Sequence, residues 1–210
     1  MGIIATSNGG SNYTPMEAGN YVARCYQMIH IGTIEETFNG ETKLQNKVRI
    51  SWETPTETKV FKEENGEQPY SLSKEFTLSM HEKSTLRKYL EGWRGKAFTK
   101  EEVEAFDISV LIGKPCMINV IHKPSKDGKK VYAEISSISS MPKGMTCPDA
   151  INKPLILAFD SWDQEVFNSL PDFVKDKINT SQEFKQMTAP EFKDMENAPK
   201  NDVNSEDLLF

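Results

Sequence analysis

Residues 70–93 read YSLSKEFTLSMHEKSTLRKYLEGW, and within this stretch the spacing of the large apolar side chains changes. Over residues 70–80 they fall mostly on every second position, which predicts a half-buried β-strand. Over residues 83–93, Leu86, Leu90 and Trp93 recur at intervals of four and three, which predicts an amphipathic helix. The sequence therefore predicts a strand followed directly by a helix.

Two further strands are expected before this stretch. Residues 20–31 (NYVARCYQMIHI) are rich in β-branched and aromatic side chains, and residues 44–53 (LQNKVRISWE) alternate cleanly between apolar and polar. The pair Asn39-Gly40 between them is typical of a hairpin turn. Residues 54–69 are polar, and the sequence predicts either a long loop or a protruding hairpin with Val60 and Phe61 on one limb.

Two more strands are expected after the helix. Thr99 and Glu102 have the spacing of a capping box, which predicts a short helix through Phe106. Residues 116–122 (CMINVIH) and 130–138 (KVYAEISSI) then predict two strands joined by a turn at Asp127-Gly128. The fold class expected is mainly β: an OB-fold-like five-stranded barrel with a helical segment between strands 3 and 4. Other small β-barrels and α+β sheets share this pattern.

The sequence divides into four parts by composition. Residues 1–19 are rich in Gly, Ser and Asn and predict a flexible arm, and residues 20–145 hold the expected OB-fold domain. Residues 146–187 predict a weakly helical extension, of which residues 151–187 either pack on the barrel or act as a spacer. Residues 188–210 have few apolar side chains and predict a disordered acidic tail.

The net charge of -6 is unevenly distributed along the chain. Residues 1–150 hold 19 Lys and Arg against 19 Asp and Glu, whereas residues 151–210 hold 6 against 12. The first part can therefore present a basic groove to a nucleic acid, although the whole chain is acidic.

Basic and aromatic residues are interleaved on the expected strands, which is the mixture that a groove for single-stranded nucleic acid needs. Lysine and arginine contact phosphates, and aromatic rings stack on bases. Core packing is the competing explanation for Trp52, which shares its face with Val48 and Ile50, and the lysines near residue 126 also fit a solvated hairpin turn. The candidate DNA-binding residues are Arg24, Tyr26, Lys47, Arg49, Trp52, Phe61, Tyr70, Lys74, Lys123, Lys126, Lys130 and Tyr132.

The chain ends with two acidic residues followed by three large apolar ones. Such an end suits a partner protein with an apolar pocket rimmed by Lys or Arg, because the phenyl ring can fill the pocket while carboxylates pair with the rim. A frayed terminus is the alternative. The candidate partner-binding residues are Glu206, Asp207, Leu208, Leu209 and Phe210.

Catalytic and metal sites find little support in the sequence. His30, His81 and His122 are scattered without metal-ligand spacing, the three cysteines form no CxxC pair, and neither a phosphate-binding loop nor a nucleophile elbow occurs. We expect no catalytic residues, no metal and no cofactor, and reduced thiols. Since neither a secretory leader nor a membrane-spanning stretch is evident, no membrane partner is expected.

Several stretches resemble a group of phage and prophage single-stranded DNA-binding proteins. They are residues 21–33, 47–53, 76–99, 106–123 and 136–145, of which His81–Phe98 and the step Gly113-Lys114-Pro115-Cys116 are the most specific. The resemblance implies an OB-type core and a role in phage DNA replication or recombination, and hence the cytoplasm of a bacterial host. The tail is similar to those of bacterial single-stranded DNA-binding proteins, which recruit replication and repair enzymes, but it lacks their proline before the last phenylalanine.

These observations favour a non-enzymatic protein that binds single-stranded DNA with little sequence preference and recruits replication or recombination proteins through its tail. Two alternatives stay open: a phage adaptor that binds protein and no DNA, and a metal-dependent nuclease that would use acidic residues such as Glu101, Glu102 and Glu104. Self-association into a homo-oligomer is compatible with the sequence and not decided by it.

Overall fold

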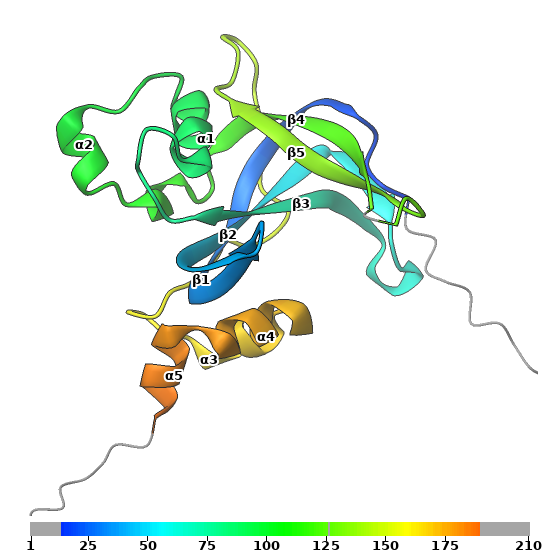
Figure 1. Ribbon diagram of the computed structural model, residues 1–210. Coiled ribbons are helices and arrows are strands. Elements are labelled where there is room, and N and C mark those ends of the chain that lie inside the picture. The colour runs from blue at the N-terminus through cyan, green and yellow to red at the C-terminus, as the bar shows by residue number, and fades with distance from the viewer. Residues whose placement is uncertain (1–13, 126, 190–210) are drawn as a thin grey trace, which may run out of the picture.

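The computed structural model describes residues 14–125 and 127–189, which form a mainly β domain with several short helices (Figure 1). Strands β3, β2, β1, β4 and β5 lie side by side in that order, each antiparallel to its neighbours, and a short β6 pairs in parallel with β1. Within the described residues, no backbone pairing joins β3 to β5, so the sheet is open. The strands are β1 Gly19–Phe38, β2 Glu41–Val60, β3 Glu67–Thr77, β4 Pro115–Pro124, β5 Val131–Ser139 and β6 Leu155–Leu157.

The first two strands are longer than their apolar patterns predict. The turn between them has positive φ at Asn39 (52°) and Gly40 (81°), as an Asn-Gly hairpin turn requires. Strand β2 continues to Val60 and pairs with β3 as far as Glu67, with an irregularity between Thr54 and Thr58. Residues 54–69 therefore form the protruding hairpin, one of the two alternatives that the sequence left open.

Short helices separate and follow the strands. Helix α1 begins at Thr85, two residues later than predicted, because the Ser84 hydroxyl caps it by accepting a hydrogen bond from the backbone N–H of Arg87 (3.1 Å). The predicted capping box at Thr99 and Glu102 is present at the start of α2. None of the described helices is long and apolar enough to cross a lipid bilayer. The helices are α1 Thr85–Arg94, α2 Lys100–Glu104, α3 Gln164–Ser169, α4 Asp172–Thr180 and α5 Gln182–Thr188, with the 3₁₀ helices η1 Glu63–Asn65 and η2 Ile108–Leu111.

The main hydrophobic core lies between one face of the sheet and α1. Trp52 of β2 is at its centre, 1% exposed, with its ring close to those of Phe76 and Trp93. Leu86 and Leu90 face the sheet from α1, which is the face that their helical spacing predicts. Core packing, the competing explanation for Trp52, is therefore the one observed.

A second core lies on the opposite face of the sheet, between β1 and the C-terminal helices. Ile29 and Ile31 of β1 pack there with Val174 and Ile178 of α4. We call β6 and helices α3–α5, residues 155–188, the C-terminal layer; Figure 1 shows its helices against β1 and β2, away from α1 and α2. Of the two alternatives for residues 151–187, packing on the sheet is the one observed.

A glycine allows the C-terminal layer to approach β1 closely. Gly32 has a φ of 90°, and a Cβ atom there would lie 2.7 Å from the Glu183 carboxylate and 2.8 Å from Ser181 Cβ. The neighbouring Thr33 donates hydrogen bonds from its N–H (2.6 Å) and its hydroxyl (2.7 Å) to the same carboxylate. These bonds fix the start of α5 against β1.

The segment that leads into the C-terminal layer is held by two polar side chains, one half-buried and one fully buried. The guanidinium of Arg24 donates to the carbonyl oxygens of Gly113 (2.6 Å) and Pro148 (2.6 Å). Its neighbour in the register, Glu53, is fully buried, and its carboxylate accepts from the backbone N–H groups of Ile151 (2.9 Å) and Asn152 (2.8 Å). The Glu53 carboxylate therefore regains, from backbone N–H groups, hydrogen bonds that it loses to water on burial.

Candidate nucleic-acid interface

Two hairpins extend from the sheet in the same direction. Arg24 of β1 pairs with Glu53 of β2 and Pro115 of β4, and from this row β2 continues to Val60 and β4 to Pro124. Figure 1 shows the outer parts of both hairpins on the side away from α1 and α2. We call residues 56–70 and 121–132, without residue 126, the hairpin end.

Aromatic side chains are exposed at the hairpin end. Phe61 is 49% exposed and Tyr132 is 45% exposed. Phe61 meets the ring of the half-buried Tyr70 edge to face, with 5.1 Å between centroids. Tyr21 of β1 lies near them, and its pKa is raised, first by burial and then by the charges of Glu57, Glu17 and Tyr70. The hairpin end therefore offers ring faces to a ligand in solvent.

The two hairpins differ in charge. The outer β2–β3 hairpin carries four glutamates and two lysines, and one of these lysines, Lys62, pairs with Glu64 (3.7 Å). The outer β4–β5 hairpin is basic, with Lys123, Lys129 and Lys130 exposed. Lys123 also pairs with Glu134 (3.0 Å), but its side chain remains 65% exposed. Positive charge at the hairpin end therefore comes from the turn between β4 and β5.

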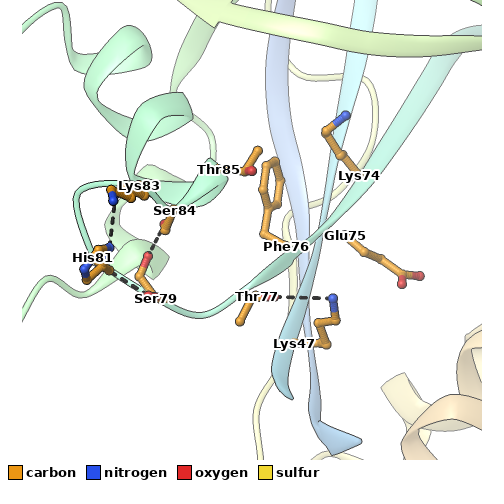
Figure 2. Close-up of a pocket in the computed structure, with 10 residues that line it drawn as sticks. All are labelled: Lys47, Lys74, Glu75, Phe76, Thr77, Ser79, His81, Lys83, Ser84 and Thr85. Carbon is orange, nitrogen blue, oxygen red and sulfur yellow. Dashed lines mark hydrogen bonds between the residues drawn. The ribbon is translucent and has the colours of Figure 1, made fainter. Parts of the chain in front are cut away.

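A cavity of about 670 Å³ lies at the opposite end of β3 (Figure 2). It is bounded by the ends of β2 and β3, the connection from β3 to α1, and the first turn of α1. Its lining combines lysines, a histidine and four hydroxyl groups with one carboxylate and one aromatic ring. The lining residues are Lys47, Lys74, Glu75, Phe76, Thr77, Ser79, His81, Lys83, Ser84 and Thr85.

Two predicted DNA-binding lysines line this cavity, and both are paired with carboxylates. The Lys47 ammonium lies 2.6 Å from a Glu36 carboxylate oxygen and 3.4 Å from the Thr77 hydroxyl. The Lys74 ammonium lies 2.8 Å from Glu134. Burial alone would lower the pKa of Lys74, but the hydrogen bond and charge of Glu134, with Tyr89 adding to them, raise it. Lys74 therefore stays charged, and both lysines already have partners.

His81 and Lys83 complete the basic lining. Both are exposed, and the His81 Nδ1 atom accepts a hydrogen bond from the backbone N–H of Lys83 (3.2 Å). In Figure 2 these two residues lie together beside Ser79 and Ser84. Within the described part of the chain, the Lys83 ammonium has no carboxylate within ion-pair distance.

Arg49 lies under the C-terminal layer. Its guanidinium pairs with Glu75 (3.2 Å) and lies 5.1 Å from the centroid of the Phe173 ring of α4. Glu75 also pairs with Lys177 of α4 (2.6 Å). The polar face of β2 and β3, which the sequence assigns to DNA, is therefore partly covered by α4.

Three further predicted residues lie apart from both surfaces. Arg24 is engaged with backbone carbonyls, and its Nε atom is buried without a hydrogen-bond partner in the structure. Trp52 is in the main core, so its ring is not accessible to a base in this conformation. Tyr26 is half-buried at a bulge in β1, between Cys25 and Gln27.

The remaining candidates are divided between the hairpin end and the undescribed residues. Lys130 lies at the hairpin end, where its backbone N–H donates to the Ser125 hydroxyl (3.0 Å). Lys126 and the partner-binding residues Glu206, Asp207, Leu208, Leu209 and Phe210 lie outside the described residues. Among residues 14–125 and 127–189, no group of three or more His, Cys, Asp or Glu side chains is arranged to hold a metal ion.

The sequence reasoning did not select Tyr21, His81 or Lys83 as site residues. Tyr21 adjoins the predicted Tyr26, but its closeness to Tyr70 depends on the pairing of non-adjacent strands. Lys83 was assigned to the helix, together with core residues, whereas the helix begins only at Thr85. A closer reading of the Ser84 cap would have placed Lys83 in the preceding connection.

Neither a protein-family model nor a curated protein sequence matches this chain.

Proposed function

We propose that this protein binds single-stranded DNA with little sequence preference, without catalysing a reaction on it, through an OB-type domain. Exposed aromatic rings next to lysines at the hairpin end carry this proposal. Stacking tolerates any base, and lysines follow the phosphate backbone. In OB-folds, the face of strands 2 and 3 and the loop between strands 4 and 5 bind oligonucleotides. Phe61 and Tyr70 belong to the hairpin of β2 and β3, and Tyr132 and Lys130 lie beside the turn between β4 and β5.

The strand order supports an OB-type fold. An OB-fold is a partly open five-stranded Greek-key barrel. Here four successive antiparallel pairings leave β3 and β5 at the two ends of the order and parallel to each other. The Lys74 side chain of β3 donates to Glu134 and to the Ile135 carbonyl oxygen of β5, so the two edges approach each other without backbone pairing. Helix α1 lies between strands three and four in the chain.

The biological setting is part of the same proposal. The activity would belong to phage DNA replication or recombination, in the cytoplasm of a bacterial host; the resemblance of several stretches to phage and prophage single-stranded DNA-binding proteins supports this setting. The acidic end of the chain, Glu206–Phe210, would recruit replication or recombination proteins to the bound strand.

A protein-interaction module that binds no DNA is the second candidate. The ion pairs favour it, because Lys47, Arg49 and Lys74 are each neutralised by a carboxylate within the fold. Of the two surfaces described above, the hairpin end then keeps positive charge for DNA at the β4–β5 turn, and the cavity keeps it at Lys83.

Fluorescence-anisotropy titration of labelled oligo-dT and of a matched duplex, at low and high salt, separates the two candidates. The proposal predicts binding to the single strand, weakening as salt rises because counterions are released. Absence of binding to oligo-dT at low salt would overturn it and leave the interaction module. Equal affinity for the duplex would also contradict single-strand selectivity.

A further inference from the structure

We propose that the cavity between the end of β3 and the start of α1, shown in Figure 2, binds a backbone phosphate of the single strand. This inference rests on the proposed function and adds a ligand site to it. The site would lie at the opposite end of β3 from the exposed rings of the hairpin end.

The cavity has the donors that a phosphodiester needs. Lys83 supplies an exposed ammonium group, and the hydroxyl groups of Ser79 and Thr85 add neutral polar groups to the lining. Lysine is a common phosphate ligand that acts as a point charge, and hydroxyl groups contribute frequently to phosphate contacts. Apart from the imidazole of His81, the lining has one ring, that of Phe76, which is 3% exposed and therefore poorly placed to stack on a base.

The one carboxylate in the lining is neutralised from outside the cavity. Glu75 pairs with Arg49 (3.2 Å) and with Lys177 of α4 (2.6 Å). In Figure 2 its carboxylate extends away from His81 and Lys83. Glu36 and Glu134 pair with Lys47 and Lys74 in the same way. An anion would therefore meet paired lysines on one side and, on the other, the exposed ammonium of Lys83, which forms no ion pair among the described residues.

The hydrogen bond within the connection orients the histidine. The Nδ1 atom of His81 accepts from the backbone N–H of Lys83 (3.2 Å), so in the neutral ring the proton is on Nε2. That N–H can donate to an anion. His81 and Lys83 together would then provide two donors to the anion, in addition to the hydroxyl groups of the lining.

Strand β3 connects this site with the hairpin end. The strand has 11 residues and runs from Glu67, next to the exposed rings, to Thr77 in the cavity lining. At about 3.3 Å per residue, its length is roughly 35 Å. A nucleic-acid strand that is stacked on Phe61 and follows β3 would bring a later phosphate to the cavity. This continuity favours a phosphodiester over a free phosphate ion.

The test compares Lys83→Ala and the double variant H81A/K83A with wild type by salt-dependent titration of oligo-dT. Lys100→Ala is the matched control, because Lys100 is an exposed lysine of α2 that does not line the cavity. Loss of one phosphate contact should reduce the slope of log K against log salt by about 0.7. We expect a three- to tenfold weaker affinity for Lys83→Ala, partial recovery in Lys83→Arg, and no change in Lys100→Ala.

An oligo-dT with an uncharged methylphosphonate backbone identifies the group that is bound. If the cavity binds a phosphate, Lys83→Ala should leave the affinity for this oligonucleotide unchanged; an equal loss for both backbones would overturn the assignment. Competition by thymidine monophosphate that is abolished by Lys83→Ala would point instead to a free nucleotide as ligand. If wild type and Lys83→Ala bind oligo-dT with equal slopes of log K against log salt, this inference alone is contradicted. If wild type does not bind oligo-dT, the proposed function is contradicted as well.

Discussion

The ammonium group of Lys74 in β3 donates hydrogen bonds to the Glu134 carboxylate (2.8 Å) and to the Ile135 carbonyl oxygen (2.9 Å) of β5. It thereby joins the two ends of the strand order through a side chain, where the backbones do not pair. Its side chain is 19% exposed, so this contact is better shielded from solvent than most ion pairs on the surface.

Lys74→Met should destabilise the fold by about 1–3 kcal/mol, because it removes charge-assisted hydrogen bonds and leaves partly buried acceptors without a donor. Urea unfolding at pH 7 measures the change. Lys123→Ala is the control, since Lys123 pairs with the same carboxylate but is 65% exposed, and it should cost less than about 1 kcal/mol. Equal losses in the two variants would contradict a special role for Lys74.

The contribution of Lys74 should depend on pH in the acid range. Its hydrogen bond is the main cause that lowers the pKa of Glu134, and Lys123 adds to it. A carboxyl group whose pKa is lower in the folded state stabilises the fold above its unfolded pKa, about 4.3, and this stabilisation is lost as the pH falls through the folded value. The difference in unfolding free energy between wild type and Lys74→Met should therefore be constant near pH 7 and shrink below about pH 4. A difference that grows on acidification would contradict the assigned pairing.

Replacing Gly32 and Gly40 by alanine should separate the energetic cost of a steric contact from that of backbone strain at positive φ. Gly32 and Gly40 have similar φ values of 90° and 81°, but a Cβ atom at Gly40 meets nothing within 4 Å, whereas at Gly32 it would lie 2.9 Å or less from Phe159, Ser181 and Glu183. Gly40→Ala should cost about 1–2 kcal/mol through backbone strain alone. Gly32→Ala should cost about 1–3 kcal/mol more, because the C-terminal layer must shift. Urea unfolding monitored by tryptophan fluorescence measures the loss of unfolding free energy in both variants. Equal losses would show that the C-terminal layer can move away from β1 at no cost.

If the exposed rings of the hairpin end stack on bases, Phe61→Ala should weaken oligo-dT binding by about 1–3 kcal/mol. Phe173→Ala is the matched control, because Phe173 is 52% exposed, like Phe61 at 49%, but lies on α4 of the C-terminal layer. Anisotropy titrations of both variants against the same oligonucleotide make the comparison. A larger loss for Phe173→Ala would move the interface to the face covered by α4.

The three cysteine thiols should differ in reactivity. Burial raises the pKa of Cys25 to about 12 and raises that of Cys116 well above its usual value, so both remain protonated at pH 8 and are inaccessible. Cys147 is half-buried, and burial also raises its pKa, although Arg24 opposes the effect. In an Ellman assay, one thiol of the native protein should react slowly, and all three should react in denaturant. No thiol of native Cys147→Ser should react. Rapid reaction of two native thiols would contradict the buried placement.

Periodicity predicted β2, β3 and α1 because each of them presents its apolar side chains to the main core. Val48, Ile50 and Trp52 are buried as their alternation predicts, and Leu86, Leu90 and Trp93 as their helical spacing predicts. The ends of β1 and β2 were not predictable in this way. The outer parts of both strands extend beyond the main core, so the alternation of apolar and polar side chains is lost there. The backbone pairing nevertheless continues.

The candidate site was less predictable, because a charged side chain on a strand does not reveal its partner. Arg49 and Lys47 alternate with core residues as a basic groove would, but their partners, Glu75 and Glu36, depend on strand register and on a bulge in β1. The C-terminal layer over Arg49 has only weak helical patterning in its sequence, since its helices are short. Phe61 and Tyr132 remain exposed because both lie near hairpin turns, which the sequence does indicate.

The pairing of β1 with the C-terminal layer has a consequence for synthesis on the ribosome. Ile29 and Ile31 emerge early, but Ile178, which covers them, is translated about 150 residues later. At a translation rate of roughly 5–20 residues per second, this isoleucine face of β1 stays uncovered for about 7–30 s. During that interval a nascent chain exposes the type of surface that chaperones bind, so production of the native protein depends on their capacity.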